Sequence, residues 1–398
     1  MNKRILILCE AIAPPALSPR VITLIEWLQN NGWECVLITE ECAEHPFHTD
    51  VCLNYQMPVY THTLLDKLYW GKDKALYQFA KQKVDISSFD IIFCSSYYYF
   101  PLYAAHLLSQ EYRIPLAVDL RDIAEQWGDI CYFTRTITPF KKLNYWIGKL
   151  YERRQLRRRN QILHSANIVT TVSPWHKNLL AQYNKNTHLI YNGYDANTFM
   201  PQDIVCDKFY ITYLGKLYFT LLRDPRLLFE SLRQLYEEEL IDKKLVRVLF
   251  HTDTKGIEEI KCLGEQYQIS PMLELNGFVP RQEILPIMHK SSILLVLTSK
   301  STPNGTHGIM GTKFFENIGV EKPILCVRSD EECLADTIAN THAGLAATNI
   351  EDVKTFILEK YQEWKTRGYT RQPVINKEQF TRQHEAKQFE QLFEQCIQ

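Results

Sequence analysis

Short apolar runs alternate with longer amphipathic stretches through the first half of the chain. The apolar runs are typical of buried parallel strands. They cover Ile5–Cys9, Cys35–Thr39, Ile91–Ser95, Leu116–Leu120 and Ile168–Val172. Between them, apolar residues recur at helical spacing, for example over Arg20–Asn31 and Pro101–Glu111. This alternation of strand and helix predicts a doubly wound α/β sheet.

The same alternation starts again near residue 208. The strands that it predicts are Phe209–Leu214, Val246–His251, Leu273–Leu275, Ile293–Thr298 and Pro323–Val327. Helices are expected between them, as over Pro225–Leu240 and Arg281–Lys290. The repeat therefore predicts a second doubly wound domain.

These patterns divide the chain into an N-terminal domain at 1–200 and a C-terminal domain at 201–376, with a cleft between them. Asn192–Pro201 is the expected linker. The last segment, Lys377–Gln398, predicts an amphipathic helix. The apolar residues on one side of this helix are Phe380, Phe389, Leu392 and Phe393.

Composition supports a globular protein of two domains. The chain has 398 residues, of which 45% are apolar and 23% charged, so it can fill two cores. Its formal net charge of −1 gives no reason to expect a nucleic-acid partner. The 11 cysteines include no C-x-x-C pair, which disfavours metal ligation and a disulfide framework and favours a reducing cytosol. No apolar run approaches the roughly 20 residues of a membrane-spanning helix.

A phosphate site is predicted in the segment 308–326, where a glycine-rich loop leads into a helix and then a buried strand. A helix that begins at a loop presents free backbone N–H groups and a positive dipole end. Such an end binds phosphate, and Gly311, before Thr312, lets the phosphate approach the backbone. Lys313 adds a positive charge, and Glu316 is placed to accept hydrogen bonds from ribose hydroxyls. The alternative is an ordinary turn with a surface lysine.

Six segments, taken in order, resemble the motifs of glycosyltransferase family 4. They are Asp119–Asp122, Ala166–Ser173, Tyr191–Asp195, Tyr213–Tyr218, Leu275–Val279 and Gly308–Cys326. The resemblance implies the GT-B architecture, in which two Rossmann-like domains face a cleft and the last helix crosses back to the N-terminal domain. It implies a UDP- or GDP-sugar donor in the C-terminal domain and an acceptor in the N-terminal domain. It also implies transfer with retention and without a metal ion.

The sequence departs from the family at one position. Many members carry a second glutamate eight residues before the one at Glu316, where it lies near the transferred sugar. Gly308 stands there, preceded by His307. His307 or the backbone of Gly305–Gly308 could supply the sugar contacts, although His307 is equally well a plain loop residue. The departure leaves the donor sugar open, and also whether the site is active.

The expected reaction needs positive charge beside the departing diphosphate. A helix N-terminus contributes roughly 0.3–1 kcal/mol, and up to about 2 kcal/mol when partly buried, so cationic side chains are needed as well. Lys216, Arg223 and Lys313 are the candidates. Lys216 follows a strand and a glycine, a position that faces the cleft in a doubly wound fold. The alternatives are a surface lysine at Lys216 and an ion pair of Arg223 with Asp224.

Two further candidates belong to the acceptor and to the base. If a carboxylate assists the acceptor, Asp119 or Asp122 is the candidate, because both lie at the carboxyl end of a strand, and we favour Asp119. The alternative is that Asp119 and Asp122 cap the next helix and pair with Arg121, which we favour for Asp122. Val279 is expected beside the nucleotide base, with a simple strand-to-helix turn as the alternative.

The segment 135–159 combines basic and apolar residues, and only Glu152 opposes its positive charge. Its basic residues are Arg135, Lys141, Lys142, Lys149, Arg153, Arg154, Arg157, Arg158 and Arg159. Its apolar residues at helical spacing are Phe140, Leu143, Ile147 and Leu150. The pattern is typical of a helix on an anionic membrane, where each basic residue contributes about 1 kcal/mol. The alternatives are a solvated helix that packs on its own domain and a nucleic-acid patch, which nothing else supports.

Together these features predict a retaining, metal-independent glycosyltransferase at the cytoplasmic face of the membrane. Its expected acceptor is a lipid-linked saccharide in surface polysaccharide biosynthesis, as the family resemblance implies. A nucleotide-sugar 2-epimerase of the same architecture is one alternative, and it would not need the basic helix. A non-catalytic subunit of the same fold is another, because of Gly308.

Overall fold

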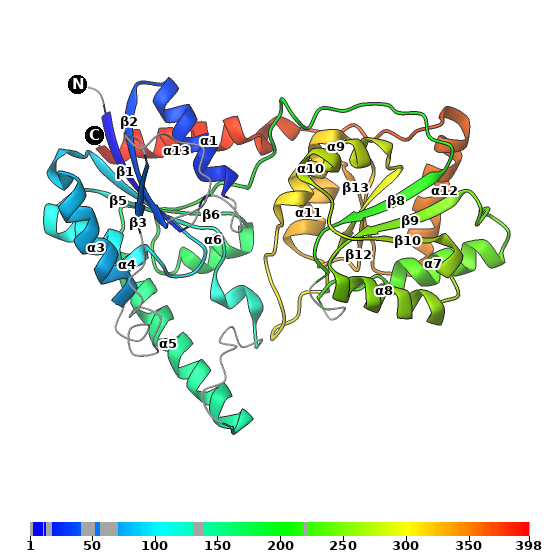
Figure 1. Cartoon of the computed structure of the whole chain (residues 1–398), viewed down its shortest axis with the longest axis horizontal. Coiled ribbons are helices and arrows are strands. Elements are labelled where there is room, and N and C mark those ends of the chain that lie inside the picture. Colours follow the sequence, from blue (N-terminus) through cyan, green and yellow to red (C-terminus); the bar gives the residue numbers. More distant parts are fainter. Residues whose placement is uncertain are drawn as a thin grey trace. The chain divides into compact units, whose positions relative to one another are not determined.

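The chain forms two compact units (Figure 1). The computed structural model describes residues 3–10, 12, 18–40, 52–55, 71–129, 139–217 and 222–397. Arg135, counted above as part of the basic segment, lies outside the described residues. Unit 1 consists of Met1–Asn192 and Arg382–Gln398, and unit 2 consists of Gly193–Thr381.

Unit 1 is built on a seven-stranded sheet in the order β3-β2-β1-β4-β5-β6-β7, with all neighbouring strands parallel. The strands are β1 (Lys3–Cys9), β2 (Trp33–Glu40), β3 (Cys52–Tyr55), β4 (Ile91–Ser96), β5 (Leu116–Leu120), β6 (Ile168–Thr171) and β7 (Thr187–Leu189). The five strands predicted for this half are confirmed. The prediction missed β3 and β7, because these outer strands are too short to form a recognisable apolar run.

Helices cover both faces of this sheet. They are α1 (Pro19–Asn30), α3 (Gly71–Lys83), α4 (Leu102–Tyr112), α5 (Lys141–Ser165), α6 (Pro174–Leu180) and α13 (Arg382–Ile397), with short 3-10 turns η2 (Ile86–Ser88) and η3 (Ala124–Trp127). Ile5 and Ile7 of β1 pack with α1 and α13, whereas Leu6 and Leu8 pack with α3 and α4. Alternate residues of a strand point to opposite faces, so β1 serves two cores and is apolar throughout.

The C-terminal helix packs on unit 1, beside α1, as the family resemblance implied (Figure 1). Phe389 and Phe393 lie 5.3 Å and 5.2 Å from Phe93 of β4, measured between ring centroids. The predicted helix over Lys377–Gln398 is wrong at its start: η5 (Lys377–Phe380) is a separate 3-10 turn, and α13 begins at Arg382. Phe380 belongs to unit 2, where it packs on Phe315.

Unit 2 has a six-stranded sheet in the order β10-β9-β8-β11-β12-β13, again with parallel neighbours. The strands are β8 (Phe209–Leu214), β9 (Val246–His251), β10 (Leu273–Asn276), β11 (Ile293–Leu297), β12 (Ile324–Val327) and β13 (Gly344–Ala346). The helices are α7 (Arg226–Glu237), α8 (Thr254–Gln266), α9 (Arg281–Lys290), α10 (Thr312–Val320), α11 (Cys333–Thr341) and α12 (Ile350–Arg367), with the turn η4 (Ser270–Met272). Both units are therefore doubly wound α/β domains.

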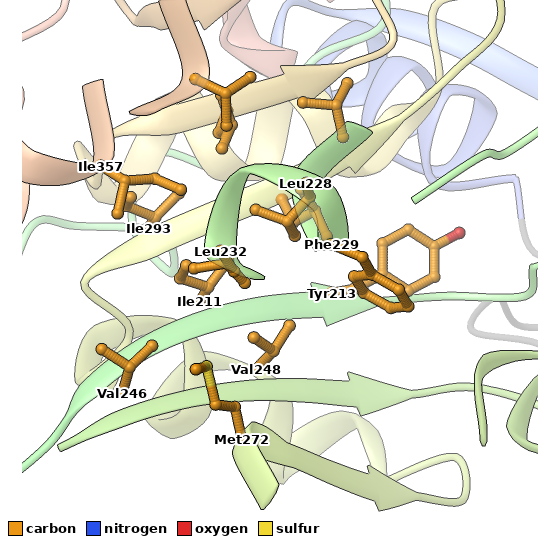
Figure 2. Close-up of a cluster of buried hydrophobic side chains, with 14 of the residues drawn as sticks. Ile211, Tyr213, Leu228, Phe229, Leu232, Val246, Val248, Met272, Ile293 and Ile357 are labelled. Carbon is orange, nitrogen blue, oxygen red and sulfur yellow. The ribbon is translucent and has the colours of Figure 1, made fainter. Parts of the chain in front are cut away.

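The main core of unit 2 lies between its sheet and helices α7 and α12. Figure 2 shows side chains of β8, β9 and α7 gathered there, among them Ile211, Val248 and Phe229. α7 is strongly amphipathic: Leu228, Phe229, Leu232 and Leu235 are all buried. This packing holds the carboxyl ends of the central strands in a fixed row, on which the candidate site is built.

Candidate functional site

The strand order of unit 2 reverses between β8 and β11. From β8 the chain adds β9 and β10 on one side, and from β11 it adds β12 and β13 on the other. Ile211 of β8 is opposite Ile293 of β11, so the two strands are direct neighbours. Ligands of open α/β sheets bind outside the carboxyl ends of the strands at such a reversal. The segments after Leu214 and Leu297 meet there.

The N-terminus of α10 follows β11 and has an open end. Gly311 is its N-cap residue, in extended conformation, and no side chain caps the helix. A Cβ atom at Gly311 would meet no atom within 4 Å, so there is room at this end for an incoming group. Thr312 and Lys313, the first two helical residues, are exposed. The helix end thus presents N–H donors and the positive dipole end to an anion.

Lys313 joins the helix end to β8. Its Nζ donates a hydrogen bond to the carbonyl oxygen of Leu214 at 2.8 Å. The side chain lies over Gly215, where a Cβ atom would be 3.1 Å from Nζ, and the φ of Gly215 is +150°. Burial lowers the pKa of Lys313, Glu316 acts to raise it, and Arg223 acts to lower it. Glu316 and Arg223 therefore both lie within electrostatic reach of Lys313.

Arg223 is held beside the end of β8. Its Nη1 donates to the carbonyl oxygen of Lys216 at 2.8 Å and to the hydroxyl of Tyr213 at 3.0 Å. The Lys216 side chain is exposed. Asp224, considered above as an alternative partner of Arg223, forms a 2.7 Å ion pair with Arg226. The guanidinium of Arg223 thus lies near the predicted phosphate site at Gly311, Thr312 and Lys313, which we call the phosphate corner.

Glu332 was missed by sequence reasoning. It precedes α11, and its carboxylate accepts hydrogen bonds from the hydroxyl of Ser301 at 3.0 Å, from Nδ1 of His307 at 2.8 Å and from the backbone N–H of Gly308 at 3.4 Å. Gly308 is buried and has a φ of +63°, a region that favours glycine. A carboxylate thus lies against Gly308, although it comes from a residue 24 positions later in the chain. No local pattern in the sequence signals this contact.

The other predicted donor residue, Val279, lies between β10 and α9 and is half-buried. β9 and β8 separate β10 from β11 in the sheet. Val279 therefore lies along the row of strand ends, not beside Lys313. Phe278, its neighbour, is 62% exposed.

Asp119 lies in unit 1 and is fully buried. Its carboxylate accepts two hydrogen bonds from Arg20, both 3.1 Å, and one each from the hydroxyls of Ser95 at 3.0 Å and Thr170 at 2.7 Å. Arg20 also pairs with Glu385 of α13. A carboxylate surrounded by four donors has no accessible lone pair for an acceptor hydroxyl, so this environment favours a structural role for Asp119.

The basic segment forms most of α5. Several apolar side chains at the start of this helix are exposed. Phe140, Trp146 and Leu150 are 69%, 60% and 63% exposed, and Leu143 and Tyr145 are also exposed. The exposed basic residues around them are Lys141, Lys142, Arg153, Arg154 and Arg157. Arg159 was wrongly included in this surface: its guanidinium is buried and paired with Glu125 at 2.6 Å, so it anchors α5 to unit 1.

No helix in the described part of the chain is both long and apolar enough to cross a bilayer. Within the same residues, no group of three or more His, Cys, Asp or Glu side chains is arranged to hold a metal ion.

Comparison with known proteins shows a common fold. Residues 18–198 match the model of Glycosyltransferase Family 4. A glycosyltransferase from Rickettsia africae is similar over 100% of this chain and 99% of its own, with a TM-score of 0.66 and 13% identity. Anabaena HepE in complex with UDP and glucose is similar over 99% of this chain and 100% of its own, with a TM-score of 0.64 and 13% identity. The lipopolysaccharide outer core galactosyltransferase WaaB is similar over 98% of this chain and 99% of its own, with a TM-score of 0.59 and 13% identity. No curated protein sequence matches the chain.

Proposed function

We propose that this protein transfers a sugar from a nucleotide sugar to an acceptor hydroxyl, because residues 18–198 match the model of Glycosyltransferase Family 4 and the whole chain has a fold similar to that of GT-B glycosyltransferases. Unit 2 binds the donor and unit 1 binds the acceptor. The observation that carries the proposal is the contact of Lys313 with the Leu214 carbonyl, which joins the open end of α10 to β8 at the strand reversal. HepE, a protein of similar fold, binds UDP and UDP-glucose, which favours a UDP-sugar over a GDP-sugar.

The chemical task of the site is to stabilise the departing diphosphate. The open N-terminus of α10 would bind phosphate oxygens, with Gly311 and Thr312 at the contact, and Glu316 would accept hydrogen bonds from the ribose. Lys313 and Arg223 would place positive charge beside the bond that breaks, with Lys216 at the rim. Positive charge placed in advance beside the departing diphosphate stabilises the negative charge that develops there.

We infer transfer with retention and without a metal ion. The sugar–phosphate bond breaks, the acceptor oxygen attacks from the same face, and the departing phosphate oxygen takes the proton of the acceptor. No protein base is needed in this step, which suits the enclosed position of Asp119. Two cationic side chains and a helix dipole would supply the charge that a metal ion provides in other transferases.

The acceptor is a lipid-linked saccharide in surface polysaccharide biosynthesis, and the protein lies on the cytoplasmic face of the membrane. The exposed apolar residues at the start of α5, with basic residues around them, are the support for this proposal. Apolar burial and attraction to anionic lipid would add together on such a helix.

A liposome experiment tests the membrane surface. Replacement of Arg153, Arg154 and Arg157 by Gln should release the protein from anionic vesicles. Three charges at about 1 kcal/mol each correspond to roughly a hundredfold loss or more of affinity. The matched control replaces three exposed lysines of unit 2, Lys244, Lys261 and Lys365. Equal binding by both variants would contradict the proposal.

The donor assignment is tested by thermal unfolding with a panel of nucleoside diphosphates and nucleotide sugars. A ligand present at 100 times its Kd stabilises the folded state by about 2.7 kcal/mol, so the correct base and sugar raise the unfolding temperature. With a sugar donor that carries the same nucleotide, the native protein should show donor hydrolysis or sugar transfer. The Glu316→Gln variant should lose this activity. No shift with any nucleotide would reject the donor site, and binding without turnover would indicate a non-catalytic subunit.

A 2-epimerase is the second candidate. A protein described as a putative UDP-N-acetylglucosamine 2-epimerase from Listeria monocytogenes has a similar fold, with a TM-score of 0.55 and 12% identity over 98% of this chain and 95% of its own. An epimerase would convert a sugar nucleotide to its epimer without an acceptor. Analysis of the sugar after incubation with donor alone distinguishes the two reactions.

A further inference from the structure

The exposed face of α5 changes character along its length. Leu143, Trp146 and Leu150 recur at intervals of three and four residues, so they lie on one side of the helix, and all three are exposed. We call them the apolar part of the face. Arg153 and Arg157 continue the same row toward the C-terminal end and are exposed as well. A single face is therefore apolar over its first part and basic over its second.

The other side of α5 is held by unit 1. Gln155, Arg159 and Ile162 are buried, and Arg159 pairs with Glu125 of η3 at 2.6 Å. At a rise of 1.5 Å per residue, the apolar part extends about 10 Å, and Arg159 lies roughly 14 Å beyond its last residue. Figure 1 shows α5 leading away from the sheet of unit 1 toward its N-terminal end. The apolar part is thus the portion of the face that lies farther from this anchor.

The order of apolar and basic residues selects an anionic bilayer as the occupant of this face. The only acidic residue of α5, Glu152, pairs with Lys149 at 3.4 Å, so its charge is engaged away from the row that contains Arg153 and Arg157. A second copy of this chain would cover the apolar part and leave the arginines in water. A bilayer surface instead offers acyl chains and lipid phosphates at two neighbouring levels.

We propose that α5 enters the outer part of an anionic bilayer at a tilt, with Leu143–Leu150 below the level of the lipid phosphates and Arg153 and Arg157 at that level. The inference rests on the proposed membrane attachment and adds the orientation of the helix. A helix that lies flat sinks about 5–10 Å along its whole length, which would bring the two arginines among acyl chains at a high cost. Lys142, beside the apolar part, has a side chain long enough to reach the phosphates. The depth is limited, because the free N–H groups of the first helical turn need polar partners.

Tryptophan quenching measures the depth at two positions of the full chain. The vesicles contain phosphatidylcholine and phosphatidylglycerol with bromine on the acyl chains, which quenches only those tryptophans that reach it. The Trp146→Phe variant gives the signal of the other tryptophans, so its difference from the native protein reports Trp146. Addition of Gln161→Trp to that variant moves the reporter about 22 Å along the same exposed face without a change of charge. We expect quenching at position 146 and none at position 161.

Replacement of the apolar part by serine measures its share of the binding. The variant with Leu143→Ser, Trp146→Ser and Leu150→Ser should bind these vesicles more weakly by roughly tenfold or more for each side chain. Its remaining binding depends on charge, so high salt should abolish it. Because all three residues are exposed, the unfolding temperature should not change. The matched control replaces three exposed apolar residues of unit 2 by serine, Met200, Leu240 and Ile375, and should bind like the native protein.

The outcomes separate the orientation from the attachment itself. Equal quenching at positions 146 and 161 would show a helix at one depth and overturn the inference. Vesicle binding without quenching at position 146 would also overturn it, because charge alone would then hold the protein. A native protein that is dimeric in solution, and monomeric after the serine replacements, would show a second copy on this face instead. If the native protein bound no vesicles at all, the proposed membrane attachment would fail and this inference with it.

Discussion

Replacement of Lys313 by methionine tests the donor site directly. Methionine retains the length of the aliphatic chain over Gly215 and removes the ammonium group. In the native protein that group donates to the Leu214 carbonyl and lies within electrostatic reach of Arg223 and Glu316. The substitution thus removes one positive charge from the predicted phosphate corner and leaves α10 in place.

The expected loss of affinity follows from the contact that a phosphate would make. A hydrogen bond to a charged group contributes about 1.5–3 kcal/mol, and each 1.4 kcal/mol is a tenfold change in Kd. UDP should therefore bind roughly 10- to 150-fold more weakly. Stability should change little, because the lost hydrogen bond to Leu214 is exposed to water. We expect a change below about 1 kcal/mol in the free energy of unfolding.

Calorimetry with UDP and thermal unfolding without ligand measure the two quantities on the same samples. The matched control is Lys300→Met, which removes a lysine of unit 2 that is exposed and paired with Glu331 at 2.6 Å. That variant should bind UDP like the native protein. If Lys313→Met lowered the unfolding temperature and left UDP affinity unchanged, Lys313 would be a structural link between α10 and β8, and the reasoning would be refuted.

Three further predictions concern other residues. Gly215→Ala should lower the unfolding temperature by at least about 2 °C, because the φ of this residue is strained for alanine. It should also weaken UDP binding, because the new methyl group displaces the Lys313 ammonium. A variant as stable as the native protein would contradict this prediction. Glu332→Gln should reduce donor turnover roughly 3- to 30-fold, since it weakens three hydrogen bonds that position the loop against Gly308, and unchanged turnover would show that the loop needs no such support. Burial raises the pKa of Glu385 from 4.5 to about 7, against the attraction of Arg20. The folded state thus holds an extra proton between pH 4.5 and 7, and stability is lost as pH rises through this window. At pH 8 the Glu385→Gln variant should therefore unfold at a higher temperature than the native protein, whereas at pH 5 it should not. The same difference in unfolding temperature at both pH values would refute this prediction.

The periodic pattern of the sequence by itself determined the architecture of both units. Central strands such as β1 and β9 are apolar along most of their length because helices cover both faces, and this pattern is legible without any knowledge of contacts. The start of α10 at Gly311–Thr312 was legible for the same reason, since a glycine-rich loop before an amphipathic run marks a helix end. The spacing of Lys313 and Glu316 on one helix turn followed from that start.

Tertiary structure alone decided which side chains meet. Asp119 and Arg20 are 99 positions apart, and only the packing of α1 on the sheet makes their ion pair and its burial. Arg159 looked like one more surface charge until the fold placed it against Glu125. Local periodicity says which face of an element is buried, but it carries no record of the partner that will cover that face.

The same limit applies to the donor site. The contact of Lys313 with Leu214 depends on β8 and β11 being neighbours, which is a property of the strand order. Glu332 reaches Gly308 from the position just before α11, 24 residues further along the chain. Such contacts arise from long-range packing, where residues far apart in the chain are brought within hydrogen-bond distance, and no short window of sequence contains both members.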